Sequence, residues 1–280
     1  MKVVLETIPV WDAFKKETEC PVCALMEEAE KDGISYYLSS AIMTPEVRVE
    51  TNDKGFCPHH FILLSKGGKP QSLALVMDTY YEKNKESFSP YFKQISSSSN
   101  PRKALKGVDG LRKAAEEREK GCLICKRMED RLERYLFTIA SLYSTDKEFK
   151  DYFNSSKGLC LHHSILLGEM ASEALKGDEL TSFIKDLFTL LEKNLERVQK
   201  DDWWMTQKYK SENKDKPWNG AEDAHKRAVE KLVGKVRVLD PATGKYRLIA
   251  LYQLPPYKTG GIFFYVSNRK KCRILQFLRL

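Results

Sequence analysis

The sequence has no long hydrophobic run, and this absence argues against a membrane-spanning protein. Its longest apolar stretches, such as LIALY and IFFYV, are far shorter than the ~18 residues that suggest a transmembrane helix. The N-terminal residues MKVVLETIPVWDAFKKE bring an acid and a proline too early for the apolar region of a signal peptide. We therefore expect a cytoplasmic protein.

The sequence also lacks the patterns that usually carry catalysis. It shows no phosphate-binding loop, no glycine pattern typical of a nucleotide site, no set of nucleophile and base, and no distinctive pair of carboxylates. No residue is proposed as catalytic, and a non-enzymatic role is favoured.

Acidic residues are scarce in the last part of the chain. Residues 235–280 contain ten Lys or Arg and one acid, Asp240, so their net charge is +9. The net charge of the whole chain is +8. Residues 1–234 therefore hold −1. A nucleic-acid surface that extends over the whole protein is excluded, and any such binding is expected only from the tail.

Histidine and cysteine are few, yet they are grouped. Six of the seven cysteines and four of the five histidines fall in two similar patterns, each C-x2-C followed after about 33 residues by C-x-H-H. Disulfides are rare in cytosolic proteins, whereas thiolate and imidazole are ligands that zinc prefers. Each pattern therefore predicts a metal site of four ligands.

The spacing also selects one histidine from each pair. Residues three apart on a helical turn share a face, so His60 is matched to Cys57 and His163 to Cys160. His59 and His162 lie roughly 200° round a helix from those cysteines, and we expect them either to support the ligands from outside the metal site or to be exposed. The predicted metal ligands are Cys20, Cys23, Cys57 and His60 in one site, and Cys122, Cys125, Cys160 and His163 in the other.

The two patterns belong to an internal repeat. When Cys20 is aligned with Cys122, Met26 falls on Met128 and Glu27 on Glu129. One inserted residue later, KGFCPHHFILL aligns with KGLCLHHSILL. Such self-similarity usually means that each copy is one structural block.

Apolar residues recur at helical spacing in both copies. We expect helices from CPVCALMEEAEKDGISYYLSSAIM, from CLICKRMEDRLERYLFTIASLY, across residues 70–86 and from FIKDLFTLLEKNLERV. The predicted fold class is mainly α, with two tandem metal-stapled helical blocks and a short β-prone basic tail. Proposed boundaries are 1–95 for the first block, 96–109 for a flexible Ser/Pro linker, 110–234 for the second block and 235–280 for the tail.

Three of the four tryptophans lie near the end of the second block. We expect Trp203, Trp204 and Trp218 to pack the last helix and its loop onto the body, although a partner surface with Lys208 and Lys210 is an alternative. His225, on a polar helix, is expected to be solvated.

The motifs CPVC, GFCPHHF, CLIC, GLCLHH and DKPWNGAEDAHKRAVEKLVG together resemble an uncharacterised family of bacterial cytosolic proteins, classed as a domain of unknown function. The resemblance covers about residues 1–234, and it implies the same eight metal ligands but no known activity. The tail lies outside it. Its Val, Ile, Tyr and Phe residues and its turn signals suggest a hairpin followed by a short basic helix, or else read-through sequence.

These observations favour a non-enzymatic zinc scaffold or adaptor that binds two zinc ions and acts through protein partners. An iron–sulfur or thiol redox protein that uses the same Cys3His sets is the main alternative. A nucleic-acid binder acting through the basic tail is the third.

Overall fold

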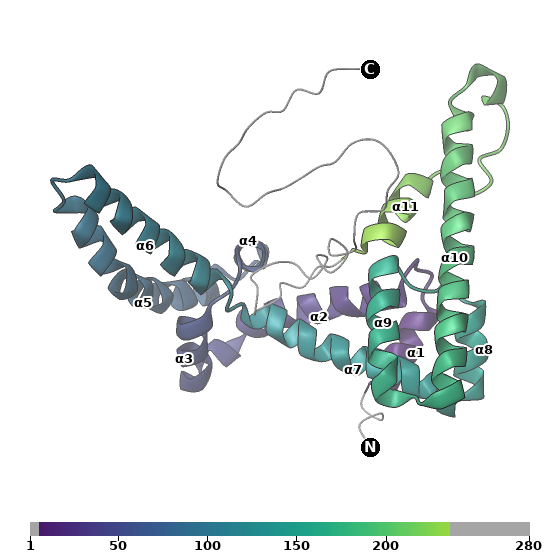
Figure 1. Cartoon of the computed structure of the whole chain (residues 1–280), viewed down its shortest axis with the longest axis horizontal. Helices are drawn as coiled ribbons and strands as arrows, with labels where there is room; N and C mark the ends of the chain where they lie inside the picture. Colours follow the sequence, from purple (N-terminus) through teal and green to yellow (C-terminus); the bar gives the residue numbers. More distant parts are fainter. Residues whose placement is uncertain (1–5, 236–280) are drawn as a thin grey trace. The chain divides into compact units, whose positions relative to one another are not determined.

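The computed structural model describes residues 6–235, and this part of the chain is mainly helical, as predicted (Figure 1). It contains eleven α-helices, two short 3-10 helices and no strand. The α-helices are α1 (Thr7–Lys15), α2 (Pro21–Tyr37), α3 (Pro45–Lys54), α4 (Pro58–Lys66), α5 (Pro70–Ser96), α6 (Pro101–Glu119), α7 (Leu123–Thr145), α8 (Lys147–Ser155), α9 (Leu161–Ala174), α10 (Gly177–Lys208) and α11 (Ala224–Val233). The predicted β-prone tail lies outside the described residues, apart from Lys235.

Proline marks the beginning of many of these helices. Five of them start at proline, namely Pro21, Pro45, Pro58, Pro70 and Pro101. At the first helical position proline loses no intrahelical hydrogen bond, because its missing N–H would have had no partner there, and its fixed φ already suits the helix. The local sequence therefore sets where these helices begin.

Helices α2 and α7 pack against each other and connect the two predicted blocks. Ile124 of α7 lies so close to α2 that a Cβ added at Gly33 would be 3.1 Å from its Cγ2. Helix α7 also packs against α8 and α9, and α9 against α10. The core therefore runs through residues of both blocks, and the described residues fall in one compact unit.

Aromatic rings fill the part of the core between α1, α7, α8 and α10. Phe149 and Phe153 of α8 are fully buried, and they contact Phe14 of α1 and Phe183 of α10. Tyr143 of α7 packs edge-on against Phe183, with ring centroids 4.7 Å apart. Edge-on pairs of this kind add about 0.5–1.5 kcal/mol each beyond the buried area.

The Ser-rich stretch predicted as a flexible linker is instead a tight turn between two long helices. Helix α5 continues to Ser96, and α6 begins at Pro101, directly after the cap residue Asn100. The Asn100 side chain accepts a hydrogen bond from the Arg102 N–H at 2.8 Å. An asparagine cap followed by proline is a helix start signal, and it outweighs the serines before it. Helices α5 and α6 lie side by side as a hairpin (Figure 1).

No helix within residues 6–235 is both long enough and apolar enough to cross a membrane.

Candidate metal centres

The eight predicted ligand residues gather in two buried clusters. Site 1 consists of Cys20, Cys23, Cys160 and His163. Site 2 consists of Cys57, His60, Cys122 and Cys125. Each of the eight is at most 3 % exposed, so both clusters are closed to solvent.

This membership corrects the predicted pairing. Each C-x2-C was expected to join the C-x2-H that follows it in the same copy, but it joins the C-x2-H of the other copy. Each site is built from two half-sites, one C-x2-C pair and one C-x2-H pair. The prediction went wrong because all four half-sites have the same internal spacing, so the sequence pattern is compatible with either pairing. The packing of α2 against α7 decides between them.

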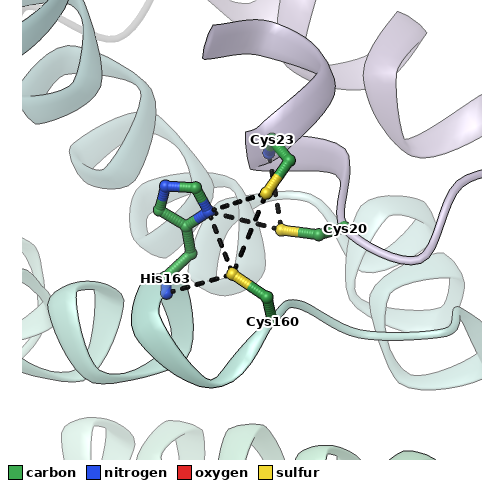
Figure 2. A group of neighbouring side chains, drawn as sticks. All are labelled: Cys20, Cys23, Cys160 and His163. Atoms are coloured by element: carbon green, nitrogen blue, oxygen red, sulfur yellow. Dashed lines mark hydrogen bonds between the residues drawn. The ribbon is translucent and has the colours of Figure 1, made fainter. Parts of the chain in front are cut away.

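Site 1 has the dimensions of a tetrahedral ion site (Figure 2). The Nδ1 atom of His163 lies 3.4 Å from the Cys20 and Cys23 sulfurs and 3.3 Å from the Cys160 sulfur. The Cys23 and Cys160 sulfurs are 3.9 Å apart. A tetrahedron with Zn–S distances of about 2.3 Å has S···S edges of about 3.8 Å and slightly shorter S···N edges. The four side chains thus surround a space that suits one ion.

Site 2 repeats these dimensions. The His60 Nδ1 atom lies 3.3 Å from the Cys57 sulfur, 3.2 Å from that of Cys122 and 3.4 Å from that of Cys125. The Cys57 and Cys125 sulfurs are 3.9 Å apart. Both sites therefore offer three sulfurs and one imidazole nitrogen to a single ion.

Four of the cysteines occupy helix N-caps, and this position explains how the ligands converge. Cys20, Cys57, Cys122 and Cys160 cap α2, α4, α7 and α9. The sulfurs of Cys20 and Cys122 accept hydrogen bonds from the N–H groups of Cys23 and Cys125, and the Cys160 sulfur from that of His163. The positive end of a helix dipole stabilises a thiolate, so each site receives two such helix ends.

The protonation of site 1 follows from the proximity of its thiols and imidazole. Burial opposes ionisation of Cys20, but hydrogen bonds with Cys160 and Cys23 and the charge of His163 lower its pKa well below the usual range. Burial likewise opposes the charged form of His163, yet the Cys20 and Cys160 sulfurs raise its pKa to about 10. The hydrogen bonds with Cys160 and Cys20 raise the pKa of Cys23.

Site 2 follows the same pattern. Hydrogen bonds with Cys122 and Cys125 lower the pKa of Cys57, and those with Cys122 and Cys57 raise the pKa of Cys125. The pKa of His60 rises to about 11 despite its burial, because Cys122, Cys57 and Glu30 accept its hydrogen bonds. These shifts favour a thiolate beside an imidazolium in each cluster, so a metal ion would have to displace protons.

Glu30 of α2 fixes the orientation of the His60 ring. Its Oε1 atom lies 3.2 Å from His60 Nε2 and 3.1 Å from His59 Nε2. A carboxylate that accepts the outer N–H of a metal-binding histidine directs the other nitrogen to the metal. Glu30 would do so here, because Nδ1 of the same ring faces the sulfurs. His59, whose side chain is 47 % exposed, lies outside the four-ligand set, as predicted.

A buried lysine joins the two chain segments that carry site 1. Lys231 of α11 is fully buried, and its Nζ donates to the main-chain oxygens of Glu19, at 2.6 Å, and Lys157, at 2.5 Å. It also lies 3.4 Å from a Glu19 carboxylate oxygen, which Arg197 contacts at 2.5 Å. Glu19 precedes Cys20, and Lys157 lies three residues before Cys160. Lys231 therefore holds both ligand-bearing segments together.

The end of α11 lies directly against site 1. Gly234 has φ +71°, and a Cβ there would be 3.4 Å from the Cys160 sulfur and 3.5 Å from that of Cys23. Only glycine combines this left-handed conformation with so close an approach. Neither Lys231 nor Gly234 was singled out from the sequence, because a lysine and a glycine at a helix end are the usual signals of a solvated terminus.

Site 2 is held by an arginine. The Arg118 guanidinium donates to the main-chain oxygens of Asn52, at 2.5 Å, and Asp53, at 3.4 Å, and it stacks 4.3 Å from the centroid of the Tyr80 ring. The Leu123 N–H donates to the Gly55 oxygen at 3.1 Å. These contacts connect the segment before Cys57 with the segment around Cys122.

The Trp-rich end of α10 forms a local cap. The Trp204 Nε1–H donates to the Pro217 oxygen at 3.1 Å, and the Lys208 ammonium donates to the Asn213 oxygen at 3.1 Å and lies 5.4 Å from the Trp218 ring. Lys208 therefore closes the loop after α10 instead of facing a partner. Trp203 is 59 % exposed, so the expectation that all three tryptophans are packed is wrong for this residue. His225 is exposed, as expected.

Taken together, the fold and the sites define a helical protein with two closed Cys3His centres that could each hold a metal ion. The chain belongs to a family of unknown function, DUF6062, whose match covers residues 1–238. The predicted resemblance to an uncharacterised family is thereby confirmed. Searches of curated proteins and of solved structures gave no significant match.

Proposed function

We propose that the protein is a non-enzymatic, cytoplasmic scaffold in which two structural zinc ions hold the helices in place. The observation that supports this most directly is the closure of both sites, with four buried ligands at tetrahedral distances. A catalytic zinc keeps one position open to water or substrate, whereas a structural zinc has four protein ligands.

The pairing of ligands gives the two ions a structural task. Site 1 joins cysteines 137 residues apart, and site 2 joins cysteines 68 residues apart. Structural zinc supplies about 10–16 kcal/mol of apparent binding free energy, which is comparable with or above the whole stability of a typical domain, about 5–15 kcal/mol. Two ions that connect distant segments would therefore hold the helices in a fixed arrangement. Such a scaffold would present its surface to protein partners.

The iron–sulfur alternative is less compatible with these distances. In a [4Fe–4S] cluster each terminal ligand binds a different iron, and in a [2Fe–2S] cluster the four ligands are divided between two irons, so the four protein ligands do not all lie in contact around one point. Sulfurs 3.9 Å apart, with one imidazole nitrogen in contact with all three, fit a mononuclear site. Binding of nucleic acid through the basic tail stays a prediction about residues outside the described part of the chain.

Metal analysis of the full chain tests the proposal. Protein purified without added metal should contain two zinc ions, and its absorption spectrum should have no visible bands. Cys160→Ser should lose one ion or both, while Cys272→Ser, the matched control at the seventh cysteine, should keep two. A coloured protein that contains iron and sulfide, or a wild-type chain without metal, would contradict the zinc scaffold.

A further inference from the structure

The surroundings of the two sites differ, and the difference lies in a second group of ligands beside site 2. Glu30 Oε1, His59 Nε2 and His60 Nε2 lie within 4.8 Å of one another. The distances from the carboxylate oxygen to the two nitrogens are 3.1 Å and 3.2 Å. Two imidazoles and one carboxylate form a common three-ligand set for zinc, with further positions left for water.

These three residues extend from the surface to the closed site. The His59 side chain is 47 % exposed, that of Glu30 is 18 % exposed and that of His60 is fully buried. His60 belongs to both ligand sets, because its Nε2 faces Glu30 while its Nδ1 contacts the three sulfurs of site 2. One imidazole ring therefore separates the outer set from the inner one.

We propose that Glu30, His59 and His60 Nε2 form a capture site, which binds a divalent metal ion at the surface and passes it to site 2. The proposal rests on the zinc-binding function proposed above and adds the route by which one of the two ions arrives. The carboxylate and the thiolates attract the cation, and the water ligands of a three-coordinate set allow rapid exchange.

Site 1 has no corresponding group among residues 6–235. In the alignment of the two copies, the position of Glu30 is occupied by Leu132, which is buried and apolar. On its other side, site 1 is covered by Lys231 and Gly234. An ammonium group beside the site opposes the approach of a cation. The sequence difference between Glu30 and Leu132 thus restricts the capture site to site 2.

Metal exchange in the zinc-loaded full chain tests the proposal. ¹¹³Cd²⁺ is added, and ¹¹³Cd NMR follows the two sites separately, each resonance being assigned through its coupling to the cysteine protons. His59→Ala should slow exchange at site 2 by about tenfold, a size common for the loss of one supporting group. The ion would arrive at site 2 and leave it by the same route, so His59→Ala should slow both steps equally. The final metal content of this variant should therefore not change. His225→Ala, which removes an exposed histidine on α11, should leave both rates unchanged.

The other outcomes separate this proposal from the one that it rests on. Two bound zinc ions with wild-type exchange in His59→Ala would overturn the capture site alone. A His59→Ala protein that loses occupancy as well as rate would also overturn it, because His59 would then support the site itself. A wild-type chain without metal would overturn the zinc scaffold, and the capture site with it.

Discussion

The sulfur of Cys23 lies 3.9 Å from the sulfur of Cys160, although 137 residues of chain separate them. Cys23 lies in the first turn of α2, and Cys160 caps α9, so an ion between them would tie the first part of the chain to the last part of the second copy. Helix α7, which carries Cys125 of the other site, packs against both α2 and α9. The two sites therefore share one set of packed helices, and disturbance of one should reach the other.

Loss of one cysteine ligand should destabilise both halves of the described chain. In Cys160→Ser we expect faster amide hydrogen exchange in α2 as well as in α9, because site 1 joins these two helices. Cys57→Ser should likewise affect α4 and α7. Protection lost only in the copy that carries the substitution would contradict the crossed pairing, and Cys272→Ser serves as the control.

Lys231→Met should weaken site 1 selectively. The substitution removes the ammonium that joins the Glu19 and Lys157 oxygens and leaves the Glu19 carboxylate paired with Arg197. Removal of one partner from a buried ion pair costs about 3–5 kcal/mol, and we expect the lower end because Arg197 remains. Denaturant unfolding measures the loss. Lys226→Met, an exposed position on the same helix, should change stability little.

Glu30→Gln should lower the metal affinity of site 2 and leave that of site 1 unchanged. The carboxylate accepts the outer N–H of His60, and replacement of such a group usually reduces affinity by about 10–100-fold. Competition with a chelator that reports the two ions separately measures the effect. Glu28→Gln, at an exposed position on α2, is the matched control. Equal weakening of both sites would mean that Glu30 acts on the fold and not on His60.

Metal affinity should rise with pH. Before an ion binds, His60 and His163 are protonated at neutral pH, because their pKa values are raised to about 11 and about 10. The thiols of Cys23 and Cys125 also keep their protons, since their pKa values are raised. Each ion therefore displaces at least two protons, and affinity should fall as pH drops. Titrations at several pH values in two buffers of different ionisation enthalpy measure the proton release. Affinity independent of pH would exclude these ligands.

The sequence predicts the ligands better than it predicts their partners. The three-residue spacing of Cys57 and His60 on a helical turn is a local property, and the structure places His60 in a four-residue set and His59 outside it. The pairing of Cys57 with Cys122 and Cys125 depends on how α2 meets α7, which no short pattern encodes. The spacing of four similar half-sites is compatible with both arrangements.

The same distinction explains the other differences. Asn100 and Pro101 form a local helix start signal, and this signal could have corrected the linker prediction because it lies in the sequence itself. Lys231 could not be recognised in this way. A lysine on a short polar helix is normally solvated, and its burial follows from contacts with Glu19 and Lys157, which lie far from it in the chain.

The crossed ligand pairing has a consequence for synthesis on the ribosome. When Cys20, Cys23, Cys57 and His60 have emerged, neither native site can be completed until residues of the second copy follow, and site 1 has to wait for His163. At about 5–20 residues per second, the 103 residues between His60 and His163 require about 5–20 s. During this time the four residues of the first copy have only one another, so an ion that arrived early would be held in a non-native, same-copy set. In a zinc-binding protein, that ion would then have to change partners as α7 and α9 are made.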